Sequence, residues 1–166
     1  MQVIKKVLDL TELTLSVVCV LSFVAMFVLG IATVVFRFII ESSLAFPDEL
    51  IRYLFIWMIS LGSAVALRRN VHAAIGVVVS HLPAVPRRAA LVGSTLLGIV
   101  FFAMILVAGI KLTMRVQSQI SPALEISMAW VYGAVPVGMA FLILFSLELV
   151  ARQLKAPDAE LLADGR

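Results

Sequence analysis

Four long stretches of the chain carry no charged residue and are almost wholly apolar. They cover residues 13–36, 53–67, 89–110 and 126–147. A helix needs about 20 apolar residues to cross the hydrocarbon core of a bilayer, and the first, third and fourth stretches reach that length. The pattern of apolar positions therefore predicts at least three membrane-spanning helices.

The stretch 53–67 is too short to cross a bilayer by itself. It becomes long enough if its helix begins at Pro47, because proline is favoured at the first helical position. Two acidic residues follow directly, and negative side chains in a first turn interact well with the positive end of the helix dipole. The second predicted span is therefore 47–67, which would be about 30 Å long.

Arg52 falls inside this second span, about 7.5 Å from its start. At that depth its long side chain can snorkel to the boundary or pair with Asp48, four residues earlier on the same helix face. Together with Glu49, these residues form a small group of charges at one membrane boundary. Either they contact a partner, or they are an interfacial ion pair with no further role.

The positions of the basic residues predict the orientation. Of 13 Lys and Arg residues, nine lie at the two termini or between the second and third spans, and four lie on the other side. Cytoplasmic segments are the ones enriched in Lys and Arg, so we expect both termini in the cytoplasm. The predicted fold is an all-α integral membrane protein with one four-span domain, residues 1–155, and a short cytoplasmic tail, residues 156–166.

Apolar residues recur at helical spacing within residues 71–82, between the second and third spans. This predicts a short amphipathic helix on the cytoplasmic surface, with His72 on its polar face; a re-entrant segment is the alternative. His72 and His81 lack the i,i+4 spacing of two metal ligands on one helix, so we expect no metal site.

Composition excludes several classes of protein. Apolar residues make up 63% of the chain and charged residues 14%, and the mean hydropathy is +1.14, which excludes a water-soluble globule. The net charge of +3 is spread along the chain, without the basic cluster that nucleic-acid binding needs. The single cysteine excludes an intrachain disulfide.

The spans are poor in groups that could carry chemistry. The third and fourth stretches contain no Asp, Glu, Lys, Arg, His, Asn or Gln, whereas a secondary transporter needs polar groups near the middle of the membrane. We find no Ser-His-Asp set, no HExxH motif and no glycine-rich phosphate loop. We therefore expect no enzymatic activity and no cofactor.

Small residues and a proline predict how the spans pack. Gly62 and Ala66 are four residues apart in the second span, as are Ser94 and Gly98 in the third, and such pairs allow helices to approach closely. Pro136 predicts a kink in the fourth span, because proline removes a helical hydrogen bond.

Aromatic residues mark one boundary of the fourth span. Trp130 and Tyr132 lie near its outer end, where amphipathic aromatic rings form a belt at the membrane interface. Trp57 lies deeper in the second span, and the belt does not explain it.

Two segments resemble the small, Q-type (DctQ-like) membrane subunit of tripartite ATP-independent periplasmic (TRAP) transporters. The first is FPDELIRYLFIWMISLGSAVALRRNVH, residues 46–72, and the second is SPALEISMAWVYGAVPVG, residues 121–138. The order and spacing of the two segments carry the resemblance. The chain departs from the family at Asp48, where the family usually has glutamate, and at Gly76, where it often has aspartate.

The resemblance implies a scaffold role in the bacterial inner membrane. A large, M-type membrane subunit would carry the sodium and organic-acid sites, and a periplasmic substrate-binding protein would deliver the cargo. We expect the first, second and fourth spans and the surface helix to form a wall against the large subunit and membrane lipids. The outer loop, residues 113–125, is a candidate contact for the binding protein. The alternatives are a self-sufficient four-helix transporter and an unrelated membrane accessory protein.

The residues expected at a partner or lipid interface are Asp48, Glu49, Arg52, Trp57, Gly62, Ala66, His72, Tyr132 and Pro136.

Overall fold

The computed structural model describes residues 2–39, 46–69 and 84–155, although not the side chains at residues 2–4, 84–88 and 155. The predicted surface helix at 71–82, with His72, lies outside the described residues, and so does the tail 156–166. The described helices are α1 (Gln2–Phe38), α2 (Phe46–Arg68), α4 (Ala84–Arg115), α5 (Ala129–Tyr132) and α6 (Ala134–Lys155).

The predicted fold class is confirmed. Four helical segments are long and apolar enough to cross a membrane, and the described residues contain no strand beyond one isolated bridge. Helix α2 begins one residue before Pro47 and carries both acidic residues in its first turn. Helix α1 is much longer than its charge-free stretch, at 37 residues or about 55 Å.

The fourth span differs from its predicted bounds. Its helix begins at Ala129 rather than at residue 126, because the backbone of Ile126 and Met128 pairs with the preceding loop instead. The helix is then interrupted at Gly133, between α5 and α6. Pro136 explains the interruption, because a proline ring clashes with the carbonyl group four residues earlier.

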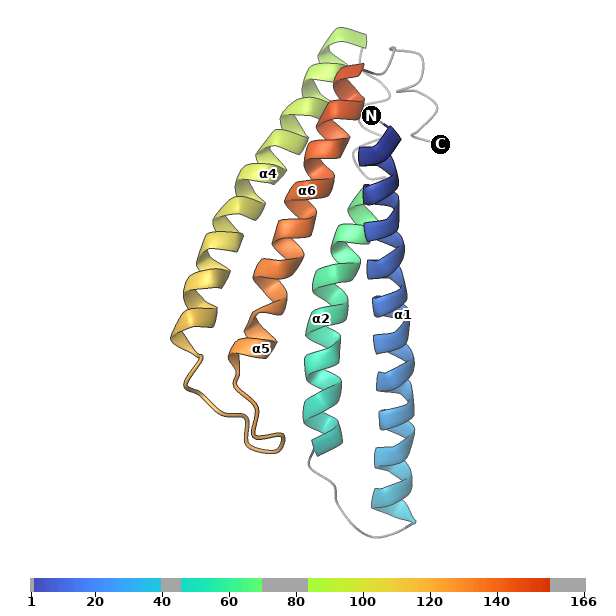
Figure 1. The fold of residues 1–166 in the computed structure, drawn as a ribbon, viewed down its shortest axis with the longest axis vertical. Coiled ribbons are helices and arrows are strands. Elements are labelled where there is room, and N and C mark those ends of the chain that lie inside the picture. Colours follow the sequence, from blue (N-terminus) through green and yellow to red (C-terminus); the bar gives the residue numbers. More distant parts are fainter. Residues whose placement is uncertain (1, 40–45, 70–83, 156–166) are drawn as a thin grey trace.

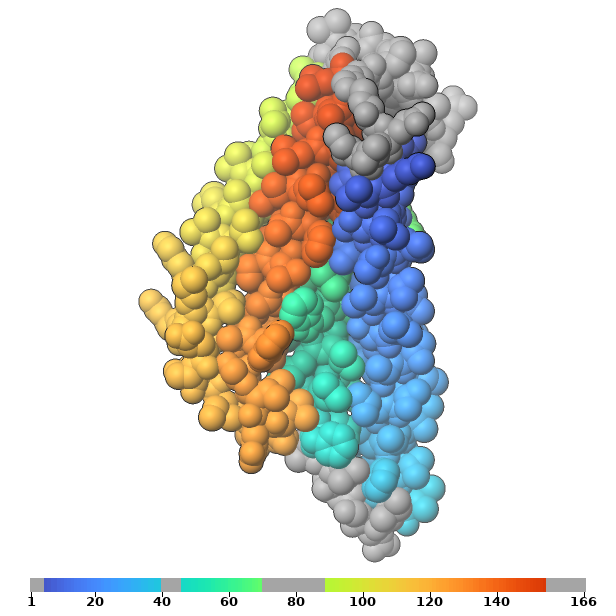
Figure 2. All heavy atoms as spheres, viewed as in Figure 1, coloured from blue at the N-terminus to red at the C-terminus, as the bar shows by residue number. Residues whose placement is uncertain are grey.

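The four long helices lie in a row rather than around a common centre. Helix α4 packs on α6, α6 packs on α2, and α2 packs on α1. Figure 2 shows the same succession with all atoms drawn, and the far end of α1 stands clear of the other helices. The domain is therefore a single layer with α2 and α6 inside it and α1 and α4 at its edges.

The packed core lies between the two inner helices, near the end of the layer that holds the start of α1. Phe145 of α6 is 1% exposed and lies among Leu61, Ala64 and Val65 of α2. Leu8 and Leu15 of α1, with Leu142 of α6, complete this cluster.

Most of the remaining surface is apolar. Phe27 of α1 is 64% exposed and Leu97 of α4 is 72% exposed, and large hydrophobic side chains are exposed along both of these edge helices. A water-soluble domain rarely exposes apolar surface on this scale, whereas hydrocarbon chains accept it. The layer thus has the surface of a membrane-embedded protein.

Candidate functional site

One end of the layer is organised around Glu49 of α2. Its side chain is buried, with the residue 5% exposed. One carboxylate oxygen accepts hydrogen bonds from the backbone N–H groups of Ala123 and Leu124, at 2.9 and 3.0 Å. The other oxygen accepts a hydrogen bond from the Tyr53 hydroxyl, one turn further along α2. Glu49 therefore joins the start of α2 to the segment between α4 and α5.

We name that segment the Ser121 loop, residues 116–128. It folds back on itself: the Ser121 N–H donates to the Ile126 carbonyl at 2.9 Å, and the Met128 N–H donates to the Gln119 carbonyl at 2.9 Å. At its tip, Glu125 has a positive φ of 53°, a conformation that non-glycine residues adopt rarely. The loop is a closed turn with a defined shape.

The two segments that carry the family resemblance meet at this point. Glu49 belongs to the first and Ser121 to the second, and the carboxylate of one holds the backbone that follows the other. The sequence predicts Glu49 at an interface with a partner. Within the chain itself, the structure places Glu49 against the Ser121 loop, where two adjacent N–H groups converge on its carboxylate.

Asp48 and Arg52 remain on the surface of α2. Both side chains are exposed. Arg52 and Asp48 do contact each other, as predicted, but through the backbone. Arg52 Nε donates to the backbone carbonyl oxygen of Asp48 at 3.4 Å, and the structure gives no ion pair between these two described side chains. Phe55 and Ile59 are also exposed, at 47% and 49%, and share the same helix face by spacing. Helix α2 thus shows one stripe that neither α1 nor α6 covers.

Trp57 has a role that its sequence position did not explain. Its indole N–H donates to the backbone carbonyl of Trp130 at 3.1 Å, at the start of the interrupted fourth span. The rings of Trp130 and Tyr132 are exposed, at 71% and 37%, as expected of a membrane-interface belt. Trp57 is therefore a bridge between α2 and α5 inside the layer.

The small residues differ in whether they lie at a contact between helices. A Cβ added at Gly62 would meet the Cys19 sulfur of α1 at 3.8 Å, whereas one at Gly98 would meet only a side chain of its own helix. Ala66 is partly buried on α2. Pro136 packs closely on Gly109 of α4, where an added Cβ would lie 3.2 Å from the proline ring. Gly62 is thus at a helix contact within this chain, and Gly98 is not.

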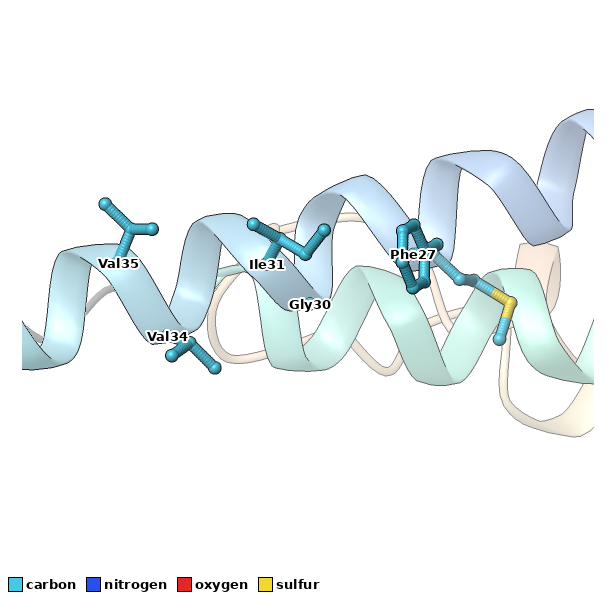
Figure 3. Close-up of a pocket in the computed structure, with 6 residues that line it drawn as sticks. Phe27, Gly30, Ile31, Val34 and Val35 are labelled. Carbon is cyan, nitrogen blue, oxygen red and sulfur yellow. The ribbon is translucent and has the colours of Figure 1, made fainter.

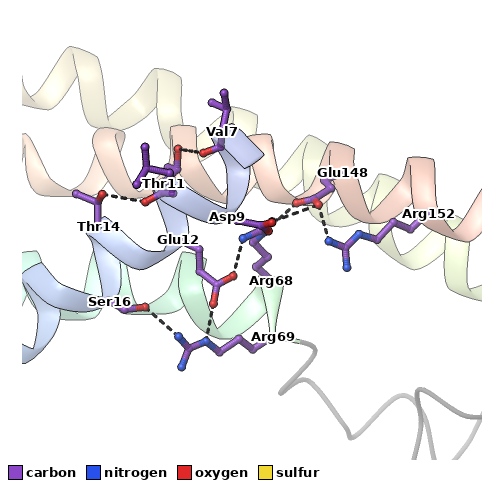
Figure 4. A network of polar contacts seen from close by, with 11 residues as sticks. Val7, Asp9, Thr11, Glu12, Thr14, Ser16, Arg68, Arg69, Glu148 and Arg152 are labelled. Carbon is purple, nitrogen blue, oxygen red and sulfur yellow. Dashed lines mark hydrogen bonds and ion pairs between the residues drawn. The ribbon is translucent and has the colours of Figure 1, made fainter. Parts of the chain in front are cut away.

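At the opposite end of the layer, Arg68 of α2 holds three helices together, as Figure 4 shows. Its guanidinium forms ion pairs with Asp9 at 2.5 Å, Glu12 at 2.6 Å and Glu148 at 2.9 Å. Asp9 and Glu12 lie on α1, and Glu148 lies on α6. The Arg68 side chain is only 4% exposed, and its guanidinium carbon lies 5.4 Å from the centre of the Phe145 ring.

Two further arginines extend this group, which we name the Arg68 cluster. Arg69 pairs with Glu12 at 2.7 Å and Arg152 pairs with Glu148 at 2.5 Å. The cluster then contains three acidic and three basic residues, so its charges balance. Sequence reasoning assigned the arginines to membrane orientation only. The signal that it missed is that acidic and basic residues stand at the same end of three helices.

Helix α1 carries a shallow apolar groove that is lined by its own side chains. Figure 3 shows Phe27, Ile31, Val34 and Val35 around Gly30. An added Cβ at Gly30 would meet nothing within 4 Å. The groove offers no polar group for a substrate, and it suits a hydrocarbon chain.

In the part of the chain that the structure describes, no three His, Cys, Asp or Glu side chains come together as metal ligands. The chemistry of the two polar ends is hydrogen bonding and charge pairing between helices. Each end joins segments that are far apart in the sequence.

Comparison with known proteins gives a family match over most of the chain. Residues 26–156 match the family described as "Tripartite ATP-independent periplasmic transporters, DctQ component". The matched region contains Glu49, the Ser121 loop and the whole of α2, including Arg68.

Three relatives carry names of the same kind. Two are proteins of Haemophilus influenzae named as TRAP transporter small permease proteins, 35% identical over 69 residues and 24% identical over 145 residues. The third is the C4-dicarboxylate TRAP transporter small permease protein DctQ of Rhodobacter capsulatus, 31% identical over 102 residues. These matches cover 42%, 86% and 60% of this chain, and 43%, 88% and 45% of the respective relatives.

Proposed function

This chain belongs to the DctQ family of small TRAP transporter subunits, and from that premise we propose that it is a static brace for a larger transporter subunit. It is a multi-pass protein of the bacterial inner membrane, with four helical segments able to span it. The resemblance predicted from residues 46–72 and 121–138 is thus confirmed at the level of the family.

The observation that carries the proposal is the single layer of helices. A path for a polar cargo needs polar groups inside a protein, at mid-membrane depth. Among the helices that the structure describes, α4, α6, α2 and α1 each pack on the next in a row, which favours a layer with two faces over a bundle around a central path. The four apolar stretches also contain no charged residue. In our proposal the cargo therefore crosses through another chain.

The partners follow from the family resemblance. A large, M-type membrane subunit supplies the sodium and organic-acid sites, and a periplasmic substrate-binding protein delivers the organic acid. The small subunit performs no catalytic step and holds no cofactor. It packs beside the portion of the large subunit that stays still during transport and holds that portion in place.

The exposed stripe of α2 is our candidate for the contact with the large subunit. It presents Asp48 and Arg52 at the boundary and Phe55 and Ile59 deeper in the membrane. Glu49 is left out of this surface, because it is buried against the Ser121 loop. We assign the groove around Gly30 to membrane lipids, since it is apolar throughout.

The proposal is tested by reconstitution. The chain is purified alone and together with a co-expressed large TRAP membrane subunit, and each preparation is placed in liposomes with a sodium gradient. Uptake of a panel of radiolabelled carboxylates is measured with the binding protein present. We expect uptake only when the large subunit is included.

Two results would count against the brace. Sodium-driven uptake by this chain alone would identify a self-sufficient transporter, which is the remaining alternative. Full uptake by the large subunit and binding protein without this chain would show that no brace is needed.

A further inference from the structure

The Ser121 loop is held against α2 by side chains from outside it, above all by Glu49. Its own backbone hydrogen bonds close the turn at residues 119–128. The tip of the turn, at Ala123 and Leu124, directs two successive N–H groups at the Glu49 carboxylate. Two adjacent amides that converge in this way form a small anion-binding concavity. Here the chain's own glutamate occupies it.

The residue that follows the two amides has an unusual backbone conformation. Glu125 directly follows Leu124 and has a φ of 53°. A non-glycine residue in this region costs free energy and persists only where its surroundings hold it there. Hydrogen bonds to an ionised acceptor are stronger than those to a neutral one. A glutamine at position 49 would therefore hold the two amides, and the turn that follows them, less firmly.

The loop presents side chains that the rest of the chain does not cover. Ile120 is 68% exposed, and Pro122 and Glu125 are exposed beside it. Glu125 is the only charged residue of the loop. The loop lies at the end of the layer opposite the Arg68 cluster, which is the side that the distribution of basic residues predicts to be the non-cytoplasmic face of the membrane. A soluble protein approaching from that side meets these residues first.

We propose that Glu49 is a positioning residue, which shapes the Ser121 loop so that the soluble substrate-binding protein can dock on it. Glu49 acts through the loop backbone and does not touch the binding protein. The inference rests on the proposed function, because the binding protein is part of that function. It adds a residue and a surface that the family match does not assign.

The test uses the full complex in liposomes under a sodium gradient, with loaded binding protein added at increasing concentration. For Glu49→Gln we expect the half-saturating concentration of binding protein to rise about tenfold, with a maximal rate within about twofold of the unmutated complex. Ile120→Ser changes the exposed surface of the loop and leaves Glu49 in place, and it should shift the same concentration. Asp9→Asn removes one negative charge at the opposite end of the layer and serves as the matched control, with no shift.

The outcomes are separable. If neither Glu49→Gln nor Ile120→Ser moves the half-saturating concentration, the inference is wrong. If Glu49→Gln instead loses the large subunit during purification, Glu49 acts in assembly and the inference is also wrong. If uptake by the unmutated complex does not depend on the binding protein at all, the proposed function itself is wrong. This outcome needs no variant, so it is distinct from a failure of the inference about Glu49.

Discussion

Gly138 of α6 lies directly against Ser60 of α2. A Cβ added at Gly138 would come within 2.7 Å of the Ser60 carbonyl oxygen and 2.8 Å of its Cβ. The two residues mark the point where the backbones of the inner helices touch. Close approach of this kind is what small residues provide between helices in membranes. The width of the layer at its centre depends on the absence of a side chain at this position.

The first prediction concerns this contact. Gly138→Ala should lower the free energy of unfolding by about 1–3 kcal/mol, because the added methyl group forces the two helices apart in a packed region. Unfolding is measured in detergent micelles by titration with sodium dodecyl sulfate and circular dichroism.

Gly93→Ala is the matched control for this substitution. Gly93 is also in a helix, but an added Cβ there would meet nothing within 4 Å. Its stability should be equal to or slightly above that of the unmutated chain, since alanine favours helix more than glycine does. Equal stability of the two variants would show that the Gly138 contact is not tight in the protein.

The second prediction concerns the Arg68 cluster. Arg68→Met should destabilise the chain by about 3–5 kcal/mol, because it removes the cation that three carboxylates share and leaves their charges unbalanced at a buried site. The stability of Arg68→Lys should lie between those of Arg68→Met and the unmutated chain. Lysine keeps the positive charge, but a single ammonium group cannot reproduce the fork of a guanidinium. The same detergent unfolding measurement orders the three proteins.

Arg69→Met provides the comparison, because Arg69 also pairs with Glu12 but its side chain is 56% exposed. Ion pairs at exposed positions contribute about 0–1 kcal/mol. If Arg69→Met proved as damaging as Arg68→Met, burial would not be the property that makes Arg68 important.

The third prediction concerns the bridge from Trp57 to the backbone of Trp130. Trp57→Phe keeps an aromatic ring and removes the indole donor, and it should cost about 0.5–1.5 kcal/mol. Trp130→Phe is the control, since its ring is 71% exposed and its carbonyl remains; the change should be smaller. Each variant leaves one tryptophan, so fluorescence during unfolding reports on that site alone. A larger loss from Trp130→Phe would contradict the bridge.

The sequence alone predicted those parts of the fold that depend on local patterns. Apolar stretches predicted the spans, and Pro136 predicted a kink in the fourth span, where the structure has an interruption at Gly133; each prediction follows from neighbouring residues and the bilayer. The start of the fourth span was placed too early. Residues 126–128 are apolar enough for a helix, but their backbone hydrogen bonds are taken by the Ser121 loop.

The polar contacts could not be predicted from local patterns. Glu49 and Leu124 are 75 residues apart, and Arg68 and Glu148 are 80 residues apart. A charge at the end of a span has an adequate explanation in snorkelling toward water, so nothing in the sequence requires a partner. Only the packing of α1, α2 and α6 in one row brings the Arg68 cluster together.

The last prediction concerns the surface that we assign to the large subunit. The exposed stripe of α2 combines a charge at the boundary with apolar side chains deeper in the membrane, and interface energy concentrates in Arg and aromatic residues of this kind. A double variant, Arg52→Ala with Phe55→Ala, should lower the amount of large subunit that co-purifies with the tagged chain at least about tenfold, which corresponds to about 1.4 kcal/mol.

The control is a double variant on the outer edge of the layer, Leu97→Ala with Val100→Ala. These α4 side chains are 72% and 57% exposed, and helix α4 lies at the far side of α6 from α2. If α2 faces the large subunit, the α4 variant should co-purify it in full, because lipid covers that edge. The opposite result, with loss of the large subunit only from the α4 variant, would move the interface to the other edge of the row. Detergent unfolding of both variants, purified alone, separates a lost contact from a lost fold.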